Sequence, residues 1–197
     1  LKGRIAEIFT FAERVPDADR QKIETYLAIK YGITLGSSTQ AEKDYVNSAG
    51  TKIWDNTANS TYNYNIAGIG RDSISDLNQK QSKSLNETNE VTIGLGLIFS
   101  TNNANTNEFT KDGDFLVWGC NNAAYTSSGT NLVTISTGIT TSLTRILRKW
   151  KIVESKEDAN GDVGNVFVSI PADAFSSFSK NADEEYVLIV SETENFT

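Results

Sequence analysis

The chain has 197 residues and a formal net charge of −7, and it contains one cysteine and no histidine. These counts exclude Ser-His-Asp and Cys-His catalysis, His-ligated metal sites and disulfides within the chain. The acid excess disfavours nucleic acid as a partner, and no apolar run reaches the roughly 20 residues of a membrane-spanning helix, so we expect no direct membrane insertion. Because there is no methionine either, we expect the chain to be a piece of a longer or processed polypeptide.

The first regular element is an amphipathic helix over residues 17–31. Pro16 marks its start, and Gly32 supplies the left-handed position that commonly ends a helix. Between them the apolar side chains follow helical spacing, at Ile23, Tyr26, Leu27 and Tyr31. The pattern predicts a helix that packs on a sheet.

The rest of the chain is typical of a β protein. Residues 36–62 are polar, with one short apolar cluster at 52–54. Short β-prone runs separated by Gly, Asn, Asp and Ser then predict strands at 64–70, 90–99, 114–119, 131–136, 146–154, 163–170 and 185–191. No helical pattern separates them, which favours a mainly β fold, an antiparallel β-sandwich with one N-terminal helix, and leaves a partly open barrel as the alternative. We divide the chain into residues 1–35, a strand and helix at the junction with a preceding sandwich, and residues 36–197, the sandwich module.

Two glycine pairs, Gly68–Gly70 and Gly94–Gly96, contain the GxG pattern. Neither continues to GxxG or precedes a helical pattern, so a nucleotide-binding loop is disfavoured. Glycine inside a strand lets another backbone or a large ring approach closely, and the tryptophans are the natural partners. Cys120 is predicted to be a small buried hydrophobe at a strand end.

Two groups of residues are candidates for ligand binding. Trp54, Tyr62 and Tyr64 are a candidate platform for stacking sugars, with core packing as the alternative. Arg148 and Trp150 belong to a basic strand that also carries Arg145, Lys149 and Lys151. That strand is a candidate surface for an acidic glycan, with ion pairing to the abundant acids as the alternative.

An acidic loop carries the candidate metal ligands Asp158, Asn160 and Asp162. Oxygen ligands at alternate positions can wrap a hard cation, so calcium is the candidate cofactor. Val163 stands where an EF-hand loop would place glycine, and an acidic hairpin tip is the alternative. A glycosidase would need two acids across a cleft, and no acid pair in this sequence is distinctive.

Several segments, taken together, resemble a known kind of module. They are RIAEIFTFAERVPDADRQKIETYLAIKYGITL, GTKIWD, NIAGIGRDSISDLNQKQSKS, VTIGLG, GDFLVWG, RKWKIVES and YVLIVSETENFT. Their order is similar to an uncharacterised β-rich module of large secreted surface and adhesin proteins of Bacteroidota and related Gram-negative bacteria. There the module typically follows a LamG-type (concanavalin-like) domain.

The resemblance implies an extracellular, non-catalytic unit on the cell surface, exported by type IX secretion and serving adhesion or gliding. It would act as a spacer or ligand-presenting unit. Its partners would be neighbouring domains of the same polypeptide, with its first strand completing a neighbouring sandwich, and surface glycans are further candidates. A carbohydrate-binding module is the alternative, and a glycosidase is a weaker one.

Overall fold

The computed structural model describes residues 3, 5–36, 40–136 and 139–193. It confirms the predicted helix as α1 (Asp17–Tyr31). Asp17 and Asp19 lie in its first turn, where carboxylates favour the positive end of the helix dipole, and Gly32 ends it at φ 62°. The predicted apolar stripe is only half-buried, whereas Thr25, Ala28 and Ile29 are the most buried side chains of the helix. The helix therefore meets the sheet through Thr25, Ala28 and Ile29.

Every strand pairing is antiparallel, which confirms the mainly β sandwich class. The strands are β1 (Tyr45–Val46), β2 (Lys52–Trp54), β3 (Tyr64–Asp72), β4 (Leu77–Gln79), β5 (Gln81–Lys83), β6 (Thr92–Leu95), β7 (Phe115–Cys120), β8 (Ser127–Ser136), β9 (Ile139–Ile146), β10 (Trp150–Ser155) and β11 (Val166–Ser169). Two short 3₁₀ turns, η1 (Ser60–Tyr62) and η2 (Ala172–Phe175), complete the described elements. The sheet orders are β10-β7-β3-β4, β11-β6-β5, β1-β2 and β8-β9.

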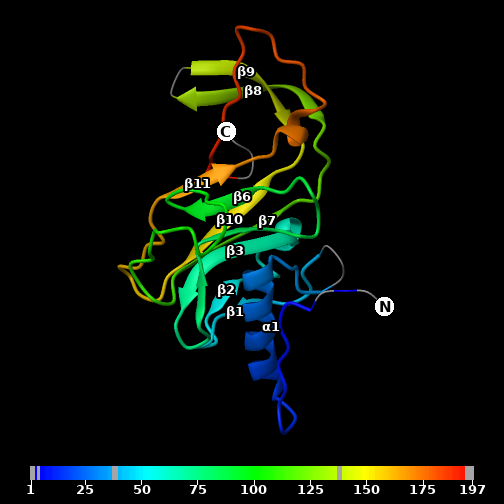
Figure 1. Ribbon diagram of the computed structural model, residues 1–197. Coiled ribbons are helices and arrows are strands. Elements are labelled where there is room, and N and C mark those ends of the chain that lie inside the picture. Colours follow the sequence, from blue (N-terminus) through cyan, green and yellow to red (C-terminus); the bar gives the residue numbers. More distant parts are fainter. Residues whose placement is uncertain (1–2, 4, 37–39, 137–138, 194–197) are drawn as a thin grey trace.

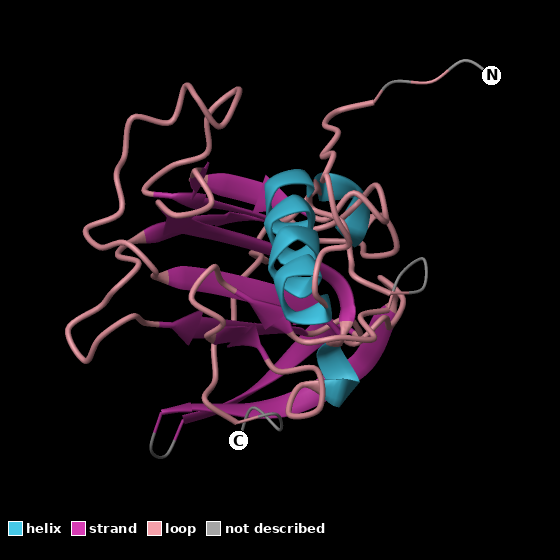
Figure 2. Ribbon diagram, turned by 90° about the horizontal axis from the view of Figure 1, so that it is seen from below, coloured by secondary structure: helices cyan, strands magenta, loops and turns pink. Residues whose placement is uncertain are grey.

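The sheet β10-β7-β3-β4 is the central layer, and it is covered on both faces (Figures 1 and 2). Alternate residues of its strands enter two different cores. On β3, Ile66 packs on the side of α1, whereas Ala67 and Ile69 pack on the side of β6; on β7, Val117 and Trp118 divide in the same way. Because α1 contributes to the first core, the helix is part of the body of the module.

Six of the seven strand predictions overlap a strand of the structure, among them the runs at 131–136, 146–154 and 163–170, which overlap β8, β10 and β11. The runs at 64–70 and 114–119 became β3 and β7, while the run at 90–99 shortened to β6. Residues 185–191 form no strand within the described structure. Sequence analysis missed β1, β2, β4, β5 and β9, which are polar or very short and form through pairing with neighbouring strands.

The glycines of β3 allow close approach, as predicted. A Cβ added to Gly68 would lie 2.8 Å from Ile29 Cδ1 of α1, and one added to Gly70 would lie 2.2 Å from Phe115 Cδ1. The close ring at Gly70 belongs to Phe115 and not to a tryptophan. Because Gly68 and Gly70 carry no side chain, Ile29 and Phe115 can pack closely against β3.

We expect Gly70→Ala to lower the free energy of unfolding by about 1–3 kcal/mol, because the new methyl group would overlap the Phe115 ring in a packed core. Urea unfolding measures the change. Gly3→Ala is the matched control, since a Cβ at Gly3 would meet nothing within 4 Å. Equal stability of the two variants would contradict the close packing of β3 on Phe115.

The β8-β9 ribbon projects from the end of the sandwich opposite the start of α1 (Figure 1). It pairs only within itself among the described strands. Among the described helices, none has the length and apolarity needed to cross a membrane.

Candidate functional site

The predicted sugar-stacking platform does not exist on the surface. Trp54 is 0% exposed and Tyr62 is 6% exposed, and both belong to the core on the side of α1. The Trp54 indole Nε1 donates a hydrogen bond of 2.8 Å to Asn63 Oδ1. Tyr64, at the start of β3, is half-buried. The prediction of Trp54 and Tyr62 as ligand-binding residues is therefore wrong, because the β2 and η1 segments turn both rings inward.

The structure does bring Arg148 and Trp150 together, but around buried acids. Arg148 precedes β10 and is 6% exposed, and it lies beside Glu90, which is 1% exposed. The guanidinium Nη1 donates to Glu87 Oε2 at 2.7 Å and also to Glu90 Oε1, while Nε donates to the Ala123 carbonyl at 2.7 Å. We call Arg148, Glu87 and Glu90 the Arg148 cluster.

Aromatic and amide groups enclose the Arg148 cluster. The guanidinium lies over the Tyr125 ring, 4.3 Å from its centroid, an arrangement that favours a cation. Trp150 Nε1 donates to Glu90 Oε2 at 3.4 Å, and Asn65 Nδ2 donates to Glu90 Oε1 at 2.8 Å. Asn65 itself adopts a left-handed conformation with φ 53°, and its buried Oδ1 has no hydrogen-bond partner among the described residues.

The two acids of the cluster respond differently to the same arginine. Burial raises the pKa of Glu90 above its usual value, although Arg148 opposes the shift. Glu87 is less buried; burial opposes its ionisation, but the hydrogen bond and charge of Arg148 hold its pKa below the usual value. Burial also raises the pKa of the Cys120 thiol to about 11, which keeps this buried sulfur protonated near neutral pH. The Arg148 cluster therefore joins segments of the fold that are far apart in the sequence.

Sequence reasoning missed Glu87, Glu90, Asn65 and Tyr125. Glu87 and Glu90 lie in a polar loop before β6, where nothing local marks them as buried. Arg148 contacts these acids across 61 and 58 residues of sequence. No periodic pattern could have indicated that pairing.

The acidic loop is held by its own contacts. Asp158 Oδ2 accepts a hydrogen bond from Lys111 Nζ at 2.6 Å, and Asp158 Oδ1 accepts one from the Asn160 backbone N–H at 2.7 Å. Asp162 Oδ1 accepts one from the Gly164 backbone N–H at 2.6 Å. In the described part of the chain, no group of three or more His, Cys, Asp or Glu side chains is placed to hold a metal ion. Calcium at Asp158, Asn160 and Asp162 stays a prediction.

If calcium binds this loop, it displaces Lys111 from Asp158, and chelation then lowers the melting temperature. The measurement is a thermal melt with calcium and with EGTA, in the wild type and in Asp162→Asn. The variant should lose the effect of calcium, because one carboxylate ligand has been neutralised. An unchanged wild-type melting temperature in EGTA would remove calcium from this loop.

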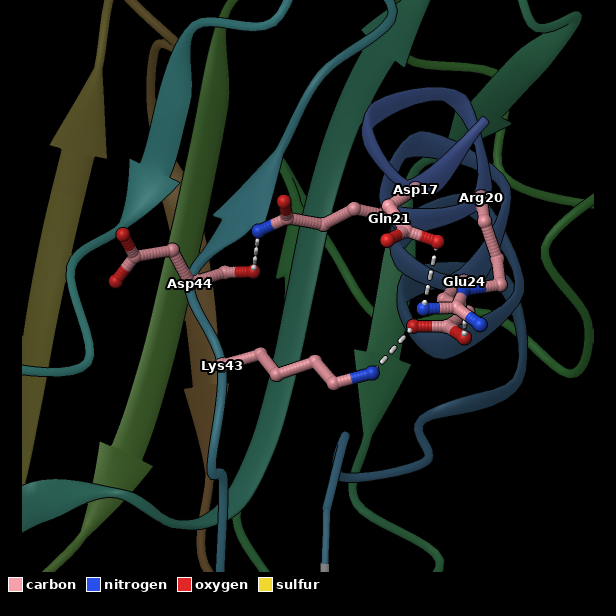
Figure 3. A pocket seen from close by; sticks show the side chains of 6 residues that line it. All are labelled: Asp17, Arg20, Gln21, Glu24, Lys43 and Asp44. Atoms are coloured by element: carbon pink, nitrogen blue, oxygen red, sulfur yellow. Dashed lines mark hydrogen bonds and ion pairs between the residues drawn. The ribbon is translucent and has the colours of Figure 1, made fainter. Parts of the chain in front are cut away.

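Two surface hollows lie on the helix side of the molecule. A pocket of about 310 Å³ lies between α1 and the segment before β1, and Figure 3 shows the side chains that line it. Its charged groups are paired: Arg20 contacts Asp17 and Glu24, and Lys43 contacts Glu24 at 3.0 Å. This pocket is lined by exposed ion pairs, and a single exposed ion pair contributes little to stability.

The second hollow is a groove of about 560 Å³ between the N-terminal segment, α1 and the β3–β4 turn. Its lining is mainly apolar and includes Phe9, Ile23 and Ile74. The buried Asp72 carboxylate in its wall is already bonded to Ser48, at 2.6 Å from the hydroxyl and 2.8 Å from the backbone N–H. The groove offers mainly apolar contact, and Asp19 and Asp76 also lie in its lining.

Comparison with curated proteins and with solved structures found no match to the chain. A family profile described as a domain of unknown function (DUF8202) matches residues 19–197. The match begins inside α1 and includes every described strand of both covering layers and of the central sheet. The chain therefore belongs to the DUF8202 family.

Proposed function

We propose that this chain is a non-catalytic extracellular module of a large bacterial cell-surface adhesin, in which it acts as a spacer or ligand-presenting unit. The observation that carries the proposal is the use of Arg148 inside the fold. The residue best suited to bind an acidic glycan is instead enclosed by Glu87, Glu90 and the Tyr125 ring. The functional groups singled out by sequence thus serve to hold the fold together.

The N-terminal segment supports contact with a neighbouring domain of the same polypeptide. Glu7 binds α1 through Lys30 and Tyr31, each at 2.9 Å, and so holds the segment in place. Ile5 and Ile8 are nevertheless 76% and 69% exposed. Contiguous exposed apolar side chains mark interaction surfaces, and a preceding sandwich that this segment completes would cover them.

Export through type IX secretion and a place in adhesion or gliding belong to the same proposal. Labelling intact and permeabilised cells with an antibody against this chain tests the location. Equal labelling of both supports exposure on the cell surface. Labelling that appears only after permeabilisation would overturn the extracellular assignment.

Carbohydrate binding is the competing function, and the half-buried Tyr64 and Trp150 are what remains of its predicted site. A glycan array with the purified chain separates the two functions. We expect no dose-dependent binding, and no release of reducing sugar from a panel of polysaccharides. Binding that is lost in Tyr64→Ala, with an unchanged circular dichroism spectrum, would favour the carbohydrate-binding module.

A further inference from the structure

The apolar groove between the N-terminal segment, α1 and the β3–β4 turn has the dimensions of a binding site. Its volume of about 560 Å³ lies within the range of ligand pockets in proteins. Phe9 and Ile74 line it, and they are 43% and 81% exposed. Leu77 and Phe115 also line it and belong to the core on the side of α1. The groove therefore offers uncovered apolar side chains above a packed base.

Asn47 adds a hydrogen-bond donor that the fold does not use. The residue lines the groove and is 5% exposed. Its Oδ1 accepts a hydrogen bond of 2.8 Å from the Thr51 backbone N–H, and its own backbone N–H donates to the Thr51 carbonyl at 2.9 Å. These bonds hold the side chain and identify Oδ1 as the acceptor. The Nδ2 group makes no hydrogen bond within the described structure, so it is available to a carbonyl oxygen of a ligand.

The charged side chains that line the groove are mostly acidic. Among the described residues they are Asp19, Asp72, Asp76 and Lys22. Ser48 occupies the Asp72 carboxylate, and Lys22 Nζ donates to Asp19 Oδ1 at 3.4 Å. The Asp76 carboxylate has neither a hydrogen bond nor an ion pair in the part of the chain that the structure describes. An excess of acids beside apolar side chains complements a partner that is both apolar and positively charged.

We propose that this groove binds a peptide segment of a partner protein in which an apolar side chain stands next to lysine or arginine. The apolar side chain would lie against Phe9 and Ile74. A peptide carbonyl would accept a hydrogen bond from Asn47 Nδ2, and the basic side chain would pair with Asp76. A purely apolar ligand would leave both polar groups unused, and an acidic peptide would be repelled by the carboxylates. The inference goes beyond the proposed function, because a spacer needs no peptide-binding site.

An array of short synthetic peptides tests the binding to the purified chain. The peptides differ only at two adjacent central positions, of which one is apolar or polar and the other is basic, neutral or acidic. Isothermal titration calorimetry then measures the affinity of the strongest binders. We expect these to combine an apolar residue with lysine or arginine, and to weaken about tenfold or more when glutamate replaces the basic residue. Their affinity should also fall at high salt, because ions screen exposed charges.

Two substitutions at exposed positions separate the apolar contact from the charge. Ile74→Ser should weaken every apolar peptide about tenfold, because it removes apolar surface that binding would bury. Asp76→Asn should weaken only the basic peptides, by about threefold, the effect of one exposed ion pair. Asparagine tolerates the left-handed backbone of Asp76, at φ 55°. The matched controls are Leu85→Ser and Asp183→Asn, since both residues are exposed and neither lines the groove. Circular dichroism melts confirm that each variant is folded.

Three results would overturn the proposal. One is the absence of binding by any peptide at concentrations up to about 1 mM, the weak end of specific affinity. Another is binding that Ile74→Ser or Asp76→Asn leaves unchanged, which would place the peptide elsewhere on the molecule. The third uses 2-phenylethylamine, an apolar amine without a peptide group: if it binds as tightly as the best peptide, the groove takes small organic cations. The cell-labelling result does not depend on any of these outcomes, so failure here is distinguishable from failure of the proposed function.

Discussion

Replacing Arg148 with leucine is expected to lower the free energy of unfolding by about 3–5 kcal/mol, because it leaves a buried carboxylate without its cation. Glu90 is 1% exposed and shares the Arg148 guanidinium with Glu87. The change also removes the contact with the Tyr125 ring and the hydrogen bond to the Ala123 carbonyl. Urea unfolding at neutral pH, followed by tryptophan fluorescence, measures the loss.

A second substitution separates the two causes of the lost stability, which are the unpaired buried charge and the lost packing. Adding Glu90→Gln to Arg148→Leu should recover part of the stability, since a neutral amide needs no counterion. Arg145→Leu, on the neighbouring β9, is the control and should change stability by less than about 1 kcal/mol. Equal losses in the Arg148 and Arg145 variants would show that the Arg148 cluster contributes nothing to folding.

The loss of unfolding free energy in Arg148→Leu should also depend on pH. Burial raises the pKa of Glu90 above its reference value of 4.5, so the folded state favours the protonated acid. The stabilisation from protonation is fully present below the unfolded-state pKa and is lost as pH rises through the folded-state pKa. The loss of unfolding free energy in Arg148→Leu relative to the wild type is therefore expected to shrink as pH falls through the raised folded-state pKa of Glu90. If the difference in free energy of unfolding between Arg148→Leu and the wild type stays constant from acidic to neutral pH, Glu90 is not a buried carboxylate that depends on Arg148.

The second large effect is at Trp54, where Trp54→Ala is expected to lower the free energy of unfolding by about 3–5 kcal/mol. The ring is 0% exposed and fills the core beneath α1, and its Nε1 holds Asn63 Oδ1 at 2.8 Å. Trp54→Phe should lower the free energy of unfolding by less than Trp54→Ala, because the phenylalanine ring keeps most of the apolar volume, although it cannot make the hydrogen bond. Urea unfolding measures both variants.

Phe167→Ala on β11 provides the comparison for Trp54, because Phe167 is an aromatic side chain that is 48% exposed. Phe167→Ala should lower the free energy of unfolding by clearly less than Trp54→Ala, since much of the Phe167 ring already contacts water. A fully stable Trp54→Ala that had lost binding to a sugar would reverse the assignment and restore Trp54 as a ligand-binding residue.

The sequence predicted the local elements well where a short segment carries its own signal. Pro16 and Gly32 define α1, because one begins and the other ends a helix through local backbone geometry. Short β-prone runs bounded by turn residues likewise predicted β3 and β7. The three-residue strands β4 and β5 escaped prediction because they are short and mostly polar, and they form through pairing with the adjacent strands β3 and β6.

The amino-acid sequence by itself determined the mainly β class, the N-terminal helix and the absence of histidine-dependent chemistry. Only the tertiary structure decided that Trp54 lies inside the core and that Arg148 pairs with Glu87 and Glu90. The physical reason is the range of the interactions involved. Backbone propensity and periodicity act over a few residues, whereas burial and ion pairing depend on segments about 60 residues apart that meet only when the layers pack.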